Sequence, residues 1–279
     1  MSDRNKSLSR LREGPSLASR ASGMGEAQLI TRRRLLGAGV LGAGGLVLSG
    51  CDRLNESPGL RSLLESAEGL HMRSQRLITG RDALAREFSE GDMSPTFRAN
   101  GNREVADNAY RQHLAQGFTQ WSLTVGGLVS RPLALPLAML MAMSQREQIT
   151  RHDCVEGWSA IGKWQGPQLS RVLDLAGLRP QARYIVFHCA DRFGTTPYYE
   201  SIDLVDALHP QTILAWRMNG QPLPEAHGAP LRLRVERQLG YKHAKYVMRI
   251  EARATLAGLY GGKGGYWEDS NAYQWYAGI

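Results

Sequence analysis

The stretch HDCVEGWSAIGKW, residues 152 to 164, places a cysteine beside groups that could tune its chemistry. As a thiolate, Cys154 could bind a metal or act as a nucleophile, whereas a thiol in an apolar core is a small hydrophobic residue. A disulfide with Cys189 is a third possibility. The spacing argues against a zinc site made by the protein alone, because no CxxC or HxxxH pair supplies the other ligands.

Glu156 is the second candidate, because it lies two residues beyond Cys154. If the chain is extended here, the two-residue period of a strand puts both side chains on one side. Burial and a nearby negative centre would raise the pKa of this carboxyl group, which could then carry protons. A solvent-exposed carboxylate is the alternative. We assign no role to His152 or Asp153, and we expect Trp158 and Trp164 to pack and keep the loop dry.

A run of basic residues follows in the segment HGAPLRLRVERQLGYKHAKYV, which begins at position 227. Guanidinium forks, ammonium charges and a glycine that permits close backbone approach suit a phosphate or pyrophosphate group. A solvated strand face is the alternative meaning of such a run. The residues concerned are His227, Arg232, Lys242, His243 and Lys245, with Gly240 in the turn.

The elements that must position these groups are mostly short strands. ARYIVFHCA, residues 182 to 190, is apolar enough for a buried strand, and PLRLRVERQ and KYVMRIE alternate apolar with polar residues. We expect an amphipathic helix over residues 169 to 178 and a short helix over 202 to 210 that ends at Pro210. WSLTVGG, from residue 121, predicts a strand and turn. This mixture predicts an α+β domain, rich in strands, with short helices and long loops.

The N-terminal residues have the composition of an export signal. TRRRLL, from Thr31, is similar to the twin-arginine motif, and the apolar stretch from residue 35 to 48 is too short to span a bilayer core of about 30 Å. LSGC is similar to a lipobox, in which Cys51 is acylated. A plain cleaved signal or a membrane-anchored helix is the alternative. We expect a signal with lipobox over 1–51, a tether and a helical lead-in broken by Gly69 and Gly80 over 52–93, and the main domain over 94–279.

The net charge changes when this signal is set aside. The whole chain carries 34 basic and 26 acidic side chains, a formal net charge of +8. Residues 1 to 50 hold eight of the basic and three of the acidic groups, so the remainder has a net charge of only +3. Nucleic-acid binding therefore loses its electrostatic support, and we expect no nucleic acid as a partner.

Four segments occur in an order and spacing that resemble the sulfite oxidase superfamily of molybdopterin-dependent oxidoreductases. The chain is most similar to the bacterial exported branch, which includes periplasmic methionine sulfoxide reductases. The resemblance covers roughly residues 94 to 279 and implies a molybdopterin-binding domain of the sulfite-oxidase type. The four segments are CVEGWSAIGKWQGPQLSRVL, GTTPYYESIDLVDALHP, MNGQPLPEAHGAPLRLRV and GYKHAKYVMRIE.

The resemblance implies a molybdenum ion held by the dithiolene of one molybdopterin and by Cys154. The ligands that the protein lacks would thus come from the cofactor. Cys189 stands where the exported reductases have a pterin-contacting threonine, so we expect it in the pocket. Together the positions that the resemblance assigns to cofactor binding are Asn100, Cys189, His227, Arg232, His243, Ala244 and Lys245.

Two departures bear on the substrate. The sulfite-oxidising branch has an arginine immediately before the loop asparagine, and this chain has Ala99 there. The sulfoxide-reducing branch has asparagine rather than histidine at position 227. We expect reduction of a small S- or N-oxide with Glu156 as a proton relay, and aromatic side chains such as Tyr266, Trp267 and Tyr273 at the mouth. Oxidation of the sulfite type, or a non-catalytic lipoprotein scaffold, is the alternative.

The electrons must come from or go to another protein, because the sequence has no CxxCH haem motif and no set of cysteines for an iron–sulfur cluster. We expect a cytochrome partner, either a membrane b-type or a soluble c-type protein. The signal and lipobox predict a periplasmic enzyme tethered to the membrane by lipid at Cys51. The sulfite-oxidising branch often has an extra C-terminal dimerisation domain that this sequence does not show, so we expect a monomer.

Overall fold

The computed structural model describes the backbone of residues 58–279 and the side chains of residues 67–279. The expected signal, the lipobox with Cys51 and the start of the tether lie outside these residues. Residues Glu68–Ile279 form one compact unit. The elements are α2 (Pro58–Ile78), η1 (Glu90–Asp92), α3 (Asn108–Ala115), β1 (Ser122–Gly127), β2 (Leu133–Pro136), α4 (Leu137–Ala142), β3 (Gln145–Cys154), β4 (Trp158–Pro167), α5 (Leu169–Ala176), β5 (Tyr184–Phe193), β6 (Thr196–Asp203), α6 (Leu204–Ala207), β7 (Ile213–Ala215), β8 (Arg217–Met218), β9 (Gln221–Pro222), η2 (Glu225–His227), β10 (Arg232–Arg234), η3 (Gly240–Lys242), β11 (Val247–Arg253) and α7 (Tyr266–Asn271).

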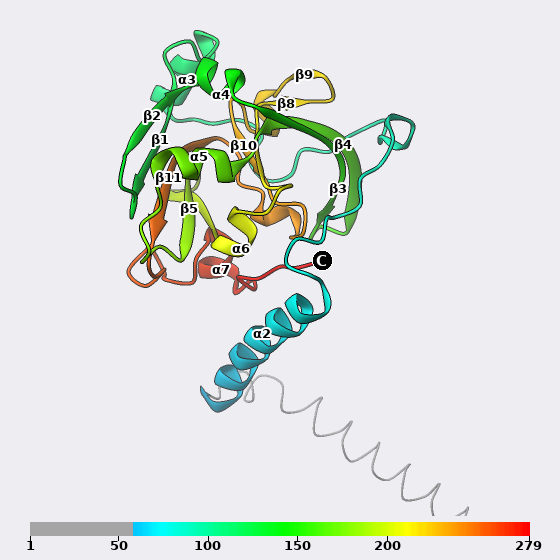
Figure 1. The fold of residues 1–279 in the computed structure, drawn as a ribbon, viewed down its shortest axis with the longest axis vertical. Helices are drawn as coiled ribbons and strands as arrows, with labels where there is room; N and C mark the ends of the chain where they lie inside the picture. Colours follow the sequence, from blue (N-terminus) through cyan, green and yellow to red (C-terminus); the bar gives the residue numbers. More distant parts are fainter. Residues whose placement is uncertain (1–57) are drawn as a thin grey trace, which may run out of the picture. The chain divides into compact units, whose positions relative to one another are not determined.

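A five-stranded sheet forms one side of the domain, in the order β2-β1-β11-β5-β6 (Figure 1). The β1–β11 pair is parallel and the other three pairs are antiparallel. Strands β5 and β6 bury longer runs, such as residues 185 to 187, whereas buried and less buried residues alternate in β1 and β11, as at Leu123 and Ile250. This alternation is the period of a sheet with one face on the core, and it explains why the apolar alternation of the sequence locates β1 and β11.

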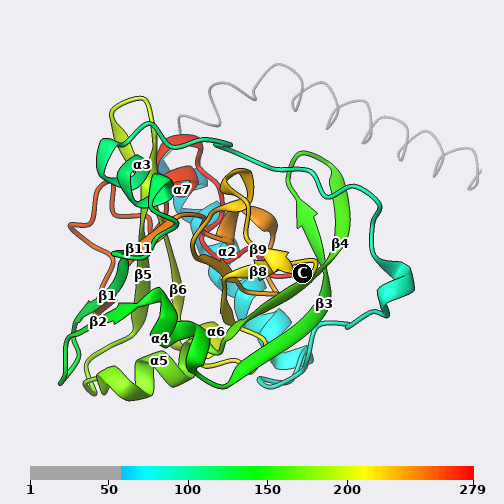
Figure 2. The same ribbon diagram turned by 90° about the horizontal axis from the view of Figure 1, so that it is seen from above.

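A long hairpin of β3 and β4 lies on the opposite side of the domain from that sheet (Figures 1 and 2). Its ladder runs in register from Gln145 opposite Pro167 to Cys154 opposite Trp158. Three residues, 155 to 157, close the turn, and Gly157 has a φ of 84°, which favours glycine. The turn therefore sets Cys154 at the last paired position of the hairpin.

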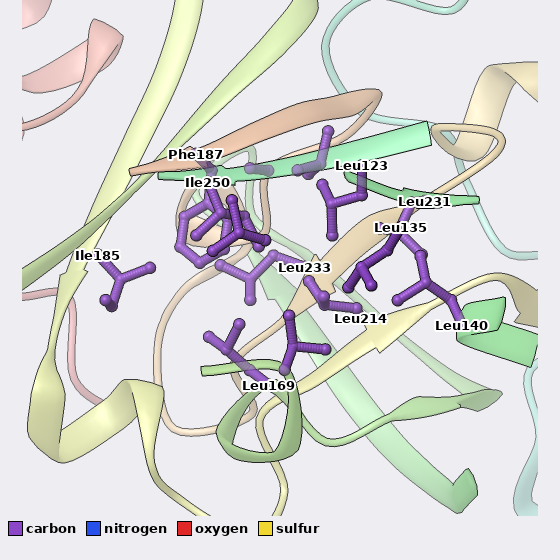
Figure 3. Close-up of a cluster of buried hydrophobic side chains, with 14 of the residues drawn as sticks. Leu123, Leu135, Leu140, Leu169, Ile185, Phe187, Leu214, Leu231, Leu233 and Ile250 are labelled. Carbon is purple, nitrogen blue, oxygen red and sulfur yellow. The ribbon is translucent and has the colours of Figure 1, made fainter. Parts of the chain in front are cut away.

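The main core lies between the five-stranded sheet and the elements opposite it (Figure 3). Leu169 from α5, Leu214 from β7 and Leu233 from β10 are fully buried against the sheet residues. Each such side chain contributes about 1.5–3 kcal/mol through removal of apolar surface from water. This core holds β10 in the interior, and β10 carries Arg232 and Arg234.

Two predicted elements, the helix from residue 169 and the strand over 182 to 190, are confirmed. Helix α5 ends at Ala176 because Gly177 adopts a left-handed conformation, with φ 70° and ψ 84°, that caps its last turn. Strand β5 occupies Tyr184–Phe193.

Two other expectations are wrong. The helix expected over 202 to 210 is only the four residues of α6, because β6 extends through Asp203 before the chain turns. The lead-in helix is not broken at Gly69, because α2 is continuous through Ile78.

The predicted fold class is confirmed as a strand-rich α+β domain with short helices and long loops. None of the helices in the described part of the chain is both long enough and apolar enough to cross a membrane.

Candidate active site

A cleft with about 650 Å³ of open space lies where the end of β3, the end of β5, η3 and the loop at residues 100 to 102 meet the C-terminal segment. Five of the residues expected to do chemistry line it. They are Asn100, Cys154, Glu156, His243 and Lys245, and they share the wall with Gly101, Asn102, Val155, Asp191, Phe193, Tyr198, Gly240, Tyr241, Trp267 and Tyr273.

Cys154 ends the inward-facing row of β3 and is only 8% exposed. It forms no disulfide, and neither does Cys189. Burial raises the pKa of the Cys154 thiol, and so does the nearby charge of Glu156, although backbone N–H groups of Glu156 and Val155 oppose the effect. Among the residues that the structure describes, no cation lowers the pKa of this thiol, so a bound metal ion is what would make it a thiolate.

The turn after β3, and not the two-residue period of a strand, places Glu156 at the cleft. Strand β3 ends at Cys154, and the turn that follows is closed by a 3.0 Å hydrogen bond from the Gly157 N–H to the Cys154 carbonyl. Glu156 is exposed, so the expectation that it is buried is wrong. Its carboxylate accepts a 2.9 Å hydrogen bond from the Trp158 indole. A role in proton transfer stays a prediction.

The inward face of β3 is polar, and its side chains bind β10. The Nδ1 atom of His152 accepts a 3.0 Å hydrogen bond from Arg234, which leaves the proton of the neutral imidazole on Nε2. Burial, followed by the charge of Arg234, holds the pKa of His152 well below its usual value. Arg234 is in turn paired with Glu236 through bonds of 2.9 and 2.5 Å. His152, which had no role on sequence grounds, therefore supports Arg234.

Arg232 lies beside Arg234 on β10, and it is fully buried without a counter-ion among the described residues. It donates one hydrogen bond of 3.1 Å to the His227 carbonyl, while its Nε and Nη2 atoms have no partner. Burial and the charge of Arg234 lower its pKa to about 9. Its guanidinium, like that of Arg234, stacks on Trp164. A buried cation with free donors is suited to an anion such as phosphate.

Lys245 and His243 reach the cleft from the segment before β11. The Lys245 ammonium donates to the carbonyls of Asn100 at 2.7 Å, Ala226 at 3.0 Å and Asn102, and so ties the loop at residues 100 to 102 to the domain. Burial and the charge of a nearby arginine lower the pKa of Lys245 to about 7.

The Nε2 atom of His243 donates to the Gln238 carbonyl at 3.0 Å, because a carbonyl can only accept. Its Nδ1 atom has no partner and is left as an acceptor at the cleft. Burial holds the pKa of His243 well below its usual value, so the ring is neutral.

Four of the expected cofactor-binding residues do not line the cleft. His227 and Arg232 are joined by the hydrogen bond given above, and burial with the charge of Arg232 lowers the pKa of His227 to about 4. Ala244 is buried, and its carbonyl accepts from the Leu233 N–H at 2.8 Å. Cys189 lies opposite Val247 in the β5–β11 ladder. Their roles in binding stay predictions.

Asp191 lines the cleft and was not anticipated from the sequence. It is 4% exposed, its Oδ2 accepts from Asn102 at 3.0 Å, and its Oδ1 has no partner. Burial raises its pKa to about 6. The register of β5 against β6 is irregular between His188 and Arg192, and such bulges re-aim side chains near binding sites. The sequence could have indicated Asp191 by one feature, an aspartate directly after the apolar run of residues 182 to 190.

The aromatic wall of the cleft agrees in part with expectation. Trp267 and Tyr273 line it, whereas Tyr266 instead stacks on Phe193 with ring centres 4.7 Å apart.

Across residues 67–279 no group of three or more His, Cys, Asp or Glu side chains could hold a metal ion. A metal beside Cys154 would therefore need ligands from another molecule.

The family described as the oxidoreductase molybdopterin binding domain matches residues 111–258. That span is more than half of the chain and includes Cys154, Asp191, Arg232 and Lys245. The chain belongs to the molybdopterin oxidoreductases. The enzyme is thus a molybdenum-dependent oxidoreductase, and its cofactor is molybdenum-bearing molybdopterin.

The relatives of this molybdopterin oxidoreductase carry related names. It is 36% identical to a protein-methionine-sulfoxide reductase subunit named YedZ1 from Azospira oryzae, over 90% of this chain and 89% of that one. It is 37% identical to the catalytic subunit MsrP of protein-methionine-sulfoxide reductase from Xanthomonas axonopodis, over 48% of this chain and 45% of MsrP. The match to MsrP of Campylobacter jejuni is 32% identical over 59% of this chain and 60% of that one.

One solved structure resembles the molybdopterin oxidoreductase more distantly. The sulfane dehydrogenase SoxCD from Paracoccus pantotrophus aligns with a TM-score of 0.46 and 22% identity, over 49% of this chain and 39% of that one.

The polar groups at the cleft fit the cofactor of this molybdopterin oxidoreductase. Cys154 lines the cleft and would supply the thiolate ligand of the metal. Arg232 lies outside the cleft lining, so a role of its free donors in holding the phosphate stays a prediction. The unpartnered Oδ1 of Asp191 and Nδ1 of His243 would accept hydrogen bonds from N–H groups of the pterin. Each of these atoms is otherwise costly to bury without a partner.

Proposed function

We propose that this enzyme reduces S-oxides, with methionine sulfoxide as the representative substrate. The observation that carries the proposal is the charge of the cleft wall. Among its described residues the wall contains no arginine, and its lysine, Lys245, is already bound to three carbonyl groups. Two carboxyl groups, those of Glu156 and Asp191, also face this space. The names of the relatives point the same way.

This wall favours a neutral substrate over sulfite. Sulfite is an anion, and sites that select such ions present arginine forks or free ammonium groups. Arg98 is exposed and does not line the cleft, and Ala99 has no charge. An S-oxide is uncharged, and the methyl thioether that it becomes makes favourable contacts with aromatic rings such as those of Trp267 and Tyr273.

Reduction of an S-oxide consumes two electrons and two protons and releases the sulfide and water. Molybdenum, when bound, supplies the two electrons and the site to which the oxygen atom transfers. The protein supplies the protons and positions the substrate. Glu156, exposed at the rim and hydrogen-bonded to Trp158, can exchange protons with solvent. Trp267 and Tyr273 exclude water from one wall of the cleft.

We also propose that the enzyme is exported to the periplasm by the twin-arginine route and acylated at Cys51. The support is the sequence TRRRLL followed by LSGC. A cofactor that binds buried groups such as Arg232 requires a folded protein, and the twin-arginine route carries folded proteins. Cys51→Ser should move the enzyme from the membrane to the soluble fraction. A cytochrome is the proposed electron donor, and a monomer the proposed state.

The catalytic proposal is tested with molybdenum-loaded enzyme and the variant Cys154→Ser. Wild-type enzyme should contain about one molybdenum per chain and reduce methionine sulfoxide with a reduced viologen dye as donor. Cys154→Ser should fold, as judged by circular dichroism, but lose the metal or the turnover. Sulfite oxidation measured with ferricyanide as acceptor should be much slower. Fully loaded enzyme without sulfoxide turnover would overturn the proposal, and turnover of sulfite alone would replace it.

A further inference from the structure

The C-terminal segment from residue 261 to 275 crosses from β6 to the cleft and carries Trp267 and Tyr273 there. We name residues 261 to 275 the strap. Two residues of β6, two positions apart, bind it: the Tyr199 hydroxyl donates to Asp269, and the Ser201 hydroxyl donates to the Gly264 carbonyl at 2.5 Å. The positions of Trp267 and Tyr273 in the cleft wall therefore depend on how firmly this strap is held.

The residue of β6 between those two, Glu200, belongs to a buried ion cluster that also includes a residue of the strap. The Lys242 ammonium lies 2.6 Å from Glu200 Oε2 and 2.5 Å from Glu268 Oε1, and all three side chains are at most 1% exposed. Lys242 belongs to η3, and the next residue, His243, lines the cleft. The cluster thus joins the strap to the segment from which cleft residues project.

The two carboxyl groups of this cluster contact the same ammonium group and lie close to each other. A side chain at Gly265 would meet Glu268 Oε2 at 2.1 Å and Glu200 Oε1 at 2.7 Å, so these two otherwise unpartnered oxygens lie near each other. Burial, and then the charge of Glu268, raise the pKa of Glu200 well above its usual value. The geometry gives the two carboxyl groups different places, because Glu200 binds Lys242 from β6 and Glu268 binds it from the strap.

We propose that Glu268 and Lys242 are positioning residues that fasten the strap and thereby hold Trp267 and Tyr273 against the substrate. The proposal rests on the S-oxide reductase function only for the identity of that substrate. The strap touches the cleft through aromatic rings, so loosening it weakens substrate binding more than it slows the oxygen transfer at the metal that Cys154 would hold.

The chain offers a matched pair of variants. Glu200→Gln changes the contact that Lys242 makes with β6 and keeps its contact with Glu268, so it should leave the strap as it is. Glu268→Gln removes the charged group by which the strap binds Lys242, while Lys242 keeps Glu200 at 2.6 Å, so the fold is retained. Loss of a charge-assisted hydrogen bond should increase the population of the open strap roughly tenfold or more.

The primary measurement is hydrogen–deuterium exchange of residues 261 to 275 in the molybdenum-loaded enzyme. We expect faster exchange there in Glu268→Gln and unchanged exchange in Glu200→Gln. With methionine sulfoxide, Glu268→Gln should show a KM raised several-fold with little change in kcat and with full molybdenum content. Trp267→Leu leaves the ion cluster intact and should raise the KM as well. It tests the role of the strap in substrate binding if Glu268→Gln folds poorly.

Unchanged exchange in Glu268→Gln would overturn the fastening role. Faster exchange with an unchanged KM, or an unchanged KM in Trp267→Leu, would overturn the role in substrate binding. Exchange does not depend on turnover. A wild-type enzyme that fails to reduce sulfoxides would therefore refute the proposed function, while the exchange data would still decide whether the strap is fastened by Glu268.

Discussion

Removal of the unpaired cation at Arg232 should make the cofactor-free protein more stable and at the same time unable to keep its cofactor. The variant is Arg232→Met, which keeps a long, flexible side chain beside Trp164 but removes the guanidinium that stacks on it. Arg234→Met is the control, because Arg234 is equally buried but is paired with Glu236 through two hydrogen bonds. The two substitutions remove the same group from neighbouring positions of one strand.

The expected magnitude follows from the pKa of Arg232, which falls from 12.5 to about 9 on burial. At about 1.36 kcal/mol per pKa unit, this corresponds to a penalty on the order of 5 kcal/mol for holding the charge in the folded state. The buried charge lowers the free energy of unfolding at every pH below about 9, and this penalty disappears as the pH rises towards 12.5. The bond to His227 and the stack on Trp164 offset about 2 kcal/mol. A net gain of about 2–4 kcal/mol remains for Arg232→Met.

Urea denaturation of protein made without the cofactor gives the measurement. Arg232→Met should unfold at a higher urea concentration than wild type, with the same slope, and should contain little molybdenum when made with the cofactor. Arg234→Met should unfold at a lower urea concentration, because it leaves the Glu236 charge buried and unpaired. Its free energy of unfolding should fall by about 3–5 kcal/mol. A cofactor-free Arg232→Met that is less stable than wild type would refute the reasoning.

Two further substitutions test the backbone and the carboxyl group at the cleft. Gly166→Ala should destabilise the protein by roughly 1–3 kcal/mol in urea, because a Cβ there would lie 2.0 Å from the Leu214 carbonyl oxygen. Gly126→Ala, with nothing within 4 Å, should be near neutral, and equal effects of the two would contradict the packing argument. Burial raises the pKa of Asp191 from 3.8 to about 6, so cofactor-free wild type should lose about 3 kcal/mol of stability as the pH rises from 4 to 6. Asp191→Asn should remove that decline, and urea midpoints at pH 4, 5, 6 and 7 would show whether it does.

The parts of the fold that the sequence predicts well are those whose inward face is apolar. Strand β5 is predicted by the continuous apolar run that contains Phe187, and helix α5 by the helical repeat that begins at Leu169. The position of Cys154 within a cleft was expected from the resemblance, and five expected residues line that cleft together. Local pattern and ordered motifs carry this information without knowledge of tertiary contacts.

What the sequence could not predict depends on partners far along the chain. Strand β3 was missed because its inward residues, such as Thr150 and His152, are polar and are satisfied by Arg234 of β10. Asp191 was missed because a bulge, not a motif, aims it into the cleft. The burial of Glu156 was expected from a strand that in fact ends two residues earlier. The error at β3 arises because polar tertiary pairing overrides local pattern.

The parallel ladder between β1 and β11 also has a consequence for synthesis of the enzyme. Thr124 pairs with Arg249, so the two central strands of the sheet are separated by roughly 125 residues of chain. Pairing so distant is slow and cannot begin until the ribosome has released nearly the whole domain. Lys245 and His243 immediately precede β11. The cofactor pocket is therefore completed in the same late step that closes the sheet, and loading must follow translation.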